Sequence, residues 1–118
     1  MTKIMNIEMN GSTYRVSLNE SRTAQAFAKS APFEASLVAG GNHCYGPIPT
    51  RLPVDRAQVT SNPHKGGVYY ADHLQAIAVY YADSGSIRPW EIVYIGDIQE
   101  DVSNLRGASG NRVELKVK

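Results

Sequence analysis

The sequence predicts a mainly β fold, a closed or nearly closed antiparallel β-barrel with one short helix and a second helical turn. Three observations predict it. An Asn-Gly dipeptide at 10–11 separates two segments of alternating apolar and polar residues, a nearly continuous apolar run covers 74–81, and only one segment has a helical pattern. Closure is favoured because a barrel leaves no unpaired strand edge for a chain of 118 residues to cover.

The chain opens with a predicted β-hairpin. Residues 4–9 and 13–18 both alternate, which is the pattern of a half-buried strand. Asn-Gly between them is the dipeptide best suited to the positive φ angles of a two-residue hairpin turn. The residues predicted to face inward are Met5, Ile7, Met9, Tyr14, Val16 and Leu18.

One α-helix is predicted over residues 23–29. Ser21 can cap its N-terminus, and the segment is rich in good helix formers with a narrow apolar face that includes Ala24 and Phe27. Pro32 ends the helix because proline has no N–H to donate. A helix of about two and a half turns is not stable alone. We therefore expect it to cover one open end of the barrel.

The next segments are a strand and a long loop. Residues 33–39 alternate and predict a strand. Residues 40–67 contain four prolines and predict a surface loop with at most one edge strand, because central strands exclude proline. Near the C-terminus we expect a helical turn over 99–107 and a strand over 111–117.

Residues 68–70 are predicted to be extended, and the apolar run 74–81 is predicted to be a strand covered on both faces. A turn at 82–85 would join it in a hairpin to a strand over 90–95, which Gly96 would break. The tyrosine doublets at 69–70 and 80–81 predict one ring inward and one ring outward or toward a pocket in each pair.

Composition bears on partners and compartment. The formal net charge is +1 and no basic block is present, which argues against nucleic acid as a partner. The single cysteine, Cys44, suits a reducing compartment. The first residues do not have the pattern of a signal peptide, and the longest apolar stretch, around 77–82, is too short to cross a bilayer. We expect a cytoplasmic protein without a membrane partner.

Four stretches carry a resemblance to a known family. They are Asn-Gly-Ser-Thr-Tyr-Arg-Val-Ser-Leu at 10–18, Thr-Ala-Gln-Ala-Phe-Ala at 23–28, Tyr-Ala-Asp-His-Leu at 70–74 and Ile-Val-Tyr-Ile-Gly-Asp-Ile at 92–98. In these the chain resembles small bacterial and archaeal cyclophilin-like proteins of unknown function. The resemblance implies a single cyclophilin-like domain over 1–118 and names no catalytic residue, since a shared fold does not transfer chemistry.

The resemblance does not extend to the prolyl isomerase site of true cyclophilins. Those enzymes carry a Phe-His-Arg segment and a proline pocket of phenylalanine and methionine. This chain has no Phe-His-Arg, and its two phenylalanines, Phe27 and Phe33, belong to the predicted helix and the following strand. Prolyl isomerase activity is therefore not supported by the residues.

Three classes of function stay open. The first is a binding or accessory module for a small molecule or peptide, with a groove at the barrel mouth. The second is an enzyme, either a divergent prolyl isomerase or a relative of the cyclophilin-like domains of amide-hydrolysing enzymes such as allophanate hydrolases and oxoprolinases. The third is a homo-oligomer whose exposed tyrosines form the interface.

No metal or cofactor is predicted. His43, His64 and His73 lack the spacing of a ligand motif, so polar loop histidines near the barrel rim are favoured over a site composed from distant loops. Cys44 would need a lowered pKa to act as a nucleophile, and a lone cysteine is more often an inert small hydrophobe.

The predicted ligand groove combines the proline-rich loop with aromatic residues. We expect Tyr45, Arg51, His73 and Tyr81 to line it, with His43 and Trp90 at its rim. Prolines between 47 and 53 would stiffen the loop, and Arg51 could hold a carboxylate in bidentate fashion. The alternatives are ordinary packing of the aromatic rings and a surface ion pair between Arg51 and Asp55.

Overall fold

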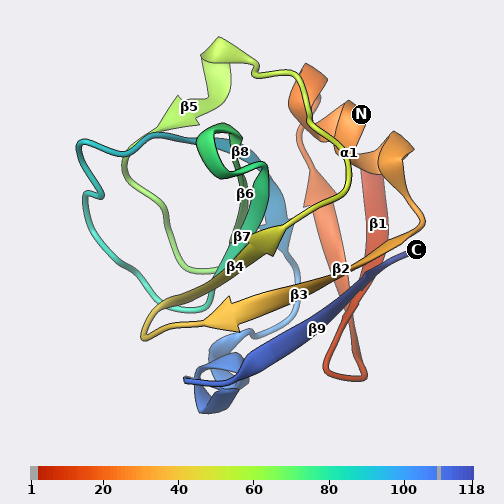
Figure 1. Ribbon diagram of the computed structural model, residues 1–118, viewed down its shortest axis with the longest axis vertical. Helices are drawn as coiled ribbons and strands as arrows, with labels where there is room; N and C mark the ends of the chain where they lie inside the picture. The colour runs from red at the N-terminus through yellow and green to blue at the C-terminus, as the bar shows by residue number, and fades with distance from the viewer. Residues whose placement is uncertain (1–2, 109) are drawn as a thin grey trace.

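The computed structural model describes residues 3–108 and 110–118 (Figure 1). In chain order the elements are β1 (Lys3–Met9), β2 (Ser12–Leu18), α1 (Arg22–Ser30), β3 (Phe33–Ala39), β4 (His43–Pro47), η1 (Arg56–Gln58), β5 (Val59–Thr60), β6 (Gly67–Ala71), η2 (Asp72–Leu74), β7 (Ala76–Tyr80), β8 (Ile92–Ile98), η3 (Ser103–Ala108) and β9 (Arg112–Val117).

The strands form a closed antiparallel barrel. Its order is β2-β1-β9-β3-β4-β7-β6-β8, and β8 pairs back onto β2, with Val16 opposite Ile98 and Leu18 opposite Gly96. The two-residue strand β5 adds to the other edge of β8, where Val59 lies opposite Val93. The predicted barrel is confirmed.

The opening hairpin is as predicted. β1 and β2 pair along their whole length, from Lys3 opposite Leu18 to Met9 opposite Ser12. Asn10 and Gly11 have φ angles of 50° and 84°, the left-handed conformation that the two-residue turn requires. The six residues predicted to face inward from this hairpin are all buried in the barrel core.

Helix α1 packs against one end of the barrel. The Ser21 hydroxyl accepts a hydrogen bond from the Ala24 amide at 3.1 Å and caps the helix, as predicted. Ala24 and Phe27 are buried in the barrel core, and α1 lies beside the ends of β1 and β2 in Figure 1. The Thr23 hydroxyl donates to the Pro53 carbonyl at 2.6 Å, so the helix also holds the loop that follows β4.

Two apolar clusters divide the tyrosine doublets. Tyr70 and Tyr81 belong to the cluster that fills the barrel. Tyr69 and Tyr80 belong to a second cluster with Ile92, on the outer face of β6, β7 and β8. The expected division of each doublet between two faces is confirmed.

The segment 40–67 differs from its prediction. β4 is not an edge strand, because it pairs with β3 at Val38 and Ala39 and with β7 along its whole length. The prolines did not exclude this strand, since Pro47 is its last residue and the other prolines of the segment follow it. The proline-rich part of the loop is therefore shorter than the sequence suggested.

The predicted hairpin of 74–81 with 90–95 is wrong. β7 pairs with β4 and β6, whereas β8 pairs with β6, β2 and β5, so residues 81–91 connect two strands that are not neighbours. β8 also continues through Gly96. A Cβ at this position would lie 2.5 Å from the Ser17 carbonyl oxygen, so glycine allows the close approach of β2 rather than ending the strand.

Candidate functional site

The outer face of the barrel carries a row of apolar and aromatic side chains. Val38 on β3 lies opposite Tyr45 on β4, Tyr45 opposite Ala78 on β7, Ala78 opposite Tyr69 on β6, and Tyr69 opposite Tyr94 on β8. Directly opposed residues share one face of a sheet. The register therefore places this row on the outside, while the alternate residues fill the barrel.

A hollow of about 450 Å³ lies on this outer face. We call it the aromatic groove. Its walls come from β4, η2, β7 and the 81–91 connection, and its main lining residues are His43, Tyr45, His73, Leu74, Tyr80 and Trp90. None of the lining residues is an aspartate, glutamate, lysine or arginine, so the groove is suited to an uncharged group.

One wall of the groove is a set of stacked rings on β4 and β7. The ring of His43 lies 4.7 Å from that of Tyr80 at an interplanar angle of 16°, and 5.6 Å from that of Tyr45 at 27°. Burial lowers the pKa of His43 because desolvation penalises the charged imidazolium. His43 is therefore a neutral ring at neutral pH.

The pair His73 and Trp90 forms a second wall of the groove. Their rings stack with centroids 5.1 Å apart and planes 13° apart. The Trp90 amide donates to the Ile87 carbonyl at 3.0 Å, and the Trp90 carbonyl accepts from the Ser61 hydroxyl at 2.8 Å. These contacts fix the backbone that presents Trp90, although 59% of the residue is exposed.

A second hollow of about 270 Å³ adjoins the groove. We call it the polar recess. It shares His73, Trp90 and Ile92 with the aromatic groove, so the stacked pair lines both spaces. Unlike the groove, the recess has charged lining residues, and these are Arg56, Asp72 and Glu91.

Four of the six residues predicted for the ligand site come together. His43, Tyr45, His73 and Trp90 all line the aromatic groove. The prediction is wrong for Tyr81, which is 1% exposed and lies in the barrel core, where its hydroxyl donates to the backbone carbonyls of Gly40 and His43. Tyr80 takes that place, because adjacent strand residues face opposite ways.

Arg51 also lies outside the groove. Its guanidinium forms an ion pair with Asp72 at 2.9 Å and donates to the Asp72 carbonyl at 3.1 Å. Neither the predicted place in the groove nor the alternative pair with Asp55 is found. Asp55 instead caps η1, where its carboxylate accepts from the Ala57 amide at 3.2 Å. Ligand binding by the remaining predicted residues stays a prediction.

Sequence reasoning missed Leu74, Tyr80, Arg56 and Glu91. The doublet at 80–81 indicated that one tyrosine faces a pocket, but only strand pairing decides which one. Leu74 was assigned to a strand, whereas it belongs to η2 and is 51% exposed. No local signal distinguished Arg56 or Glu91 from other surface charges.

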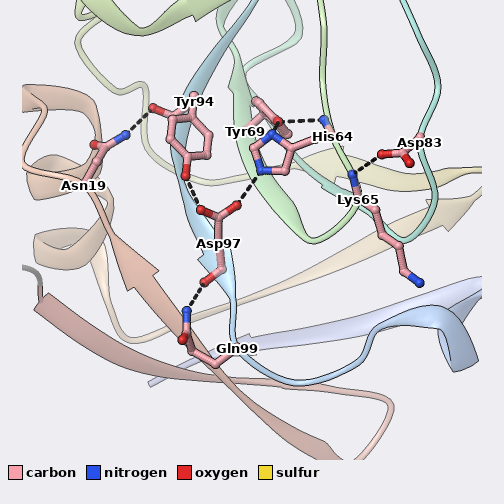
Figure 2. A network of polar contacts seen from close by, with 8 residues as sticks. All are labelled: Asn19, His64, Lys65, Tyr69, Asp83, Tyr94, Asp97 and Gln99. Carbon is pink, nitrogen blue, oxygen red and sulfur yellow. Dashed lines mark hydrogen bonds and ion pairs between the residues drawn. The ribbon is translucent and has the colours of Figure 1, made fainter.

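A polar network lies beside β8 (Figure 2). His64 Nε2 is 2.5 Å from an Asp97 carboxylate oxygen, and His64 Nδ1 is 3.1 Å from the Tyr69 hydroxyl. The Tyr94 hydroxyl donates to the other Asp97 oxygen, and the Tyr69 hydroxyl accepts from the His64 amide at 3.0 Å. Both nitrogens of the imidazole therefore have a hydrogen-bond partner within the network.

The two tyrosine hydroxyls of this network stay protonated. Burial raises the pKa of Tyr69 to about 12. The pKa of Tyr94 is also raised, first by burial and then by its hydrogen bond to the Asp97 carboxylate, which favours the neutral phenol. The arrangement therefore fastens the segment before β6 to β8 and does not supply a reactive phenolate.

Cys44 and the three histidines do not form a reactive or metal-binding cluster. Cys44 is buried, and this burial raises the pKa of its thiol to about 12. In 3–108 and 110–118, no group of three or more histidine, cysteine, aspartate or glutamate residues is arranged to hold a metal ion. Within the same residues, no helix has the length and apolar character to cross a membrane.

The class of fold is a closed antiparallel barrel of eight strands with one α-helix at its end. The chain belongs to the Cyclophilin-like family, whose model matches residues 7–118. This confirms the family resemblance that the sequence indicated. No curated protein matches the chain.

Two solved structures share the fold. One is the solution structure of the hypothetical protein AF2241 from Archaeoglobus fulgidus. The match covers 99% of this chain and 94% of the AF2241 chain, with a TM-score of 0.76 and 17% identity. The structure of McbB in complex with tryptophan matches 97% of this chain with a TM-score of 0.61 and 21% identity. This chain covers 44% of that McbB chain, so it spans less than half of its length. At these identities the two structures show the fold alone.

Proposed function

We propose that the chain is a binding module for a small molecule or a peptide and that the aromatic groove is its site. The observation that carries the proposal is the convergence of His43, Tyr45, His73 and Trp90 around one apolar hollow of about 450 Å³. A volume of this size is within the range of small-molecule sites, roughly 300–1,000 Å³.

The exposure of the groove supports the proposal. Tyr45, Leu74 and Trp90 are 41%, 51% and 59% exposed, although each is a large apolar or aromatic side chain. Contiguous exposed apolar side chains in a hollow mark a ligand or partner site more often than scattered ones do. Covering these side chains with a ligand would remove their apolar surface from water.

The walls of the groove indicate the chemistry of the ligand. Both walls are flat rings, and His43 is neutral because of its burial. Rings of this kind stack on or pack edge-on against another planar group. The first ligand class to test is therefore a compound or peptide side chain with an aromatic ring. McbB, which shares this fold, was solved in complex with tryptophan, and this also supports starting with aromatic ligands.

Trp90 makes the test direct, because it is the only tryptophan of the chain and lines the groove. We expect N-acetylphenylalanine amide to change the Trp90 fluorescence saturably and N-acetylalanine amide to have no effect. Tyr45→Ala should weaken binding about three- to tenfold, which is the size of one aromatic contact. Val38→Ala is the matched control, since Val38 is the exposed cross-strand partner of Tyr45 and does not line the groove.

No saturable change with any aromatic compound would contradict the proposal, as would equal weakening by Tyr45→Ala and Val38→Ala. The homo-oligomer that the sequence left open makes a different prediction for the same side chains. It requires a molecular mass in solution that is a multiple of 12.9 kDa and that falls to this value in a Tyr45→Ala, Trp90→Ala variant. Light scattering measures this mass.

A further inference from the structure

We infer that the polar recess binds the charged end of the ligand whose ring occupies the aromatic groove. The ligand class is then a small aromatic compound with a free carboxylate and a free amine, such as a free aromatic amino acid. This inference rests on the proposed function and narrows it, because an internal peptide residue has neither charged group.

The two spaces are placed to receive one ligand. His73 and Trp90 line both the groove and the recess, and so does Ile92. The stacked pair is therefore the boundary between an uncharged space and a charged one. A ligand that lies across this boundary would place a ring on one side and polar groups on the other.

Two charged side chains of the recess are free to bind. Arg56 and Glu91 are exposed, and neither side chain has a hydrogen bond or ion pair with the described residues. The third charged residue, Asp72, is already paired with Arg51 at 2.9 Å. The recess therefore offers one available guanidinium and one available carboxylate.

The backbones that present these two side chains are held in place. Arg56 begins η1, which Asp55 caps, and the Asp55 amide donates to the Thr23 hydroxyl of α1 at 2.9 Å. Glu91 lies between Trp90, whose carbonyl accepts from Ser61, and the first residue of β8. Preorganised positions reduce the entropy lost when a ligand binds.

The chemistry of the two groups selects the ligand. A guanidinium matches a carboxylate through paired N–H donors, and a carboxylate matches an ammonium group through charge-assisted hydrogen bonds. A zwitterion satisfies both groups together, whereas an aromatic acid or an aromatic amine satisfies one. Because the recess is open to water, each pair should contribute only about three- to tenfold in affinity.

The experiment compares four probes that share one phenyl ring: phenylalanine, N-acetylphenylalanine amide, 3-phenylpropionate and phenethylamine. Binding is followed by Trp90 fluorescence and by amide chemical shifts in ¹H–¹⁵N spectra. We expect phenylalanine to bind about ten times more tightly than N-acetylphenylalanine amide. The affinities of 3-phenylpropionate and phenethylamine, which carry one charge each, should lie between these two.

Variants assign each charge. Arg56→Ala should weaken the binding of phenylalanine and of 3-phenylpropionate and leave the binding of phenethylamine unchanged. Glu91→Gln should weaken the binding of phenylalanine and of phenethylamine and leave the binding of 3-phenylpropionate unchanged. Arg88→Ala is the matched control, since Arg88 is an exposed cation of the 81–91 connection that does not line the recess. Unchanged amide spectra away from the recess would verify that each variant is folded.

The possible results separate this inference from the proposed function. If phenylalanine and N-acetylphenylalanine amide bind equally well, the recess does not bind the charged groups of the ligand and the inference is overturned. The groove would remain a binding site in that case. Equal effects of Arg56→Ala and Arg88→Ala would also overturn the inference. If no probe binds, the proposed function itself fails.

Discussion

His43 and Tyr80 lie opposite each other on β4 and β7 with their rings stacked, 4.7 Å apart at 16°. The pair belongs to the outer face of the barrel, yet Tyr80 is 4% exposed and His43 is half-buried. Stacking therefore covers part of an imidazole that would otherwise be hydrated. Burial of the imidazole lowers the pKa of His43, which links the groove to the pH dependence of stability.

The first prediction concerns that pH dependence. Because the pKa of His43 is lower in the folded than in the unfolded state, the unfolded state binds the proton more readily. The contribution of His43 to the free energy of unfolding is thus present above its unfolded pKa, about 6.5, and is lost as the pH falls toward its folded pKa. His43→Phe keeps a planar ring and removes the titration.

Urea unfolding at about pH 7.5 and about pH 5.5 measures the effect. The free energy of unfolding should fall less with acid in His43→Phe than in the unchanged protein. The other titrating groups are the same in both proteins and cancel in the comparison. Equal losses of stability in the two proteins would contradict the assignment.

The second prediction concerns the network around Asp97. Asp97→Ala removes the acceptor of both His64 and Tyr94, and His64→Ala removes the contacts with Asp97 and Tyr69. Each change should lower the free energy of unfolding by about 1–2 kcal/mol, since these partly exposed hydrogen bonds contribute modestly. Because the residues share contacts, the double variant should lose less than the sum of the single losses.

Chemical denaturation of the four proteins in this cycle gives the coupling between His64 and Asp97. Losses that add fully would show that the two side chains do not act together. Glu34→Ala is a suitable control, because Glu34 is an exposed carboxylate of β3 whose side chain has no hydrogen bond or ion pair with the described residues. It should change stability by less than about 0.5 kcal/mol.

The third prediction is that the protein does not accelerate prolyl cis–trans exchange on a model peptide. Arg51, the arginine predicted to line the ligand groove, is held by Asp72 and does not line it. Uncatalysed exchange takes on the order of tens of seconds, so a protease-coupled assay would detect even modest catalysis. An acceleration that disappears in Arg51→Ala would favour the enzyme interpretation instead.

How much of the structure the sequence predicts depends on how far apart in the chain the contacting residues lie. The hairpin at Asn10-Gly11 and the helix capped by Ser21 were predicted, because turn and capping contacts join residues that are close in the chain. The final strand was also predicted, since Val113, Leu115 and Val117 alternate inward along a single segment.

Errors arose where the partner lies far away in the chain. Proximity suggested that β8 pairs with β7, but its partners are β6, β2 and β5. Arg51 was expected to line the groove, with an ion pair to the nearby Asp55 as the alternative, and instead it pairs with Asp72 of η2, which is distant in the chain. The groove was partly predicted because His43 and Tyr45 share a strand face, whereas the choice between Tyr80 and Tyr81 required the pairing of β7.

The last prediction concerns closure of the barrel, which depends on Gly96. β2 and β8 pair over three residues only, and Gly96 lies opposite Leu18 at the end of this contact. A methyl group at position 96 would lie 2.5 Å from the Ser17 carbonyl oxygen and 3.1 Å from the Leu18 Cα. Both are backbone atoms, so relief requires the two strands to move apart.

Gly96→Ala should therefore lower the free energy of unfolding by about 2–3 kcal/mol, in the range of overpacked sites. Gly41→Ala is the matched control, because a Cβ there meets no atom within 4 Å and the φ angle is not in the left-handed region. That control should leave stability unchanged or raise it by up to about 1 kcal/mol, since alanine restricts the unfolded chain. Equal free energies of unfolding of the two variants would mean that β2 and β8 can move apart without loss of stability. Closure of the barrel would then not depend on this glycine.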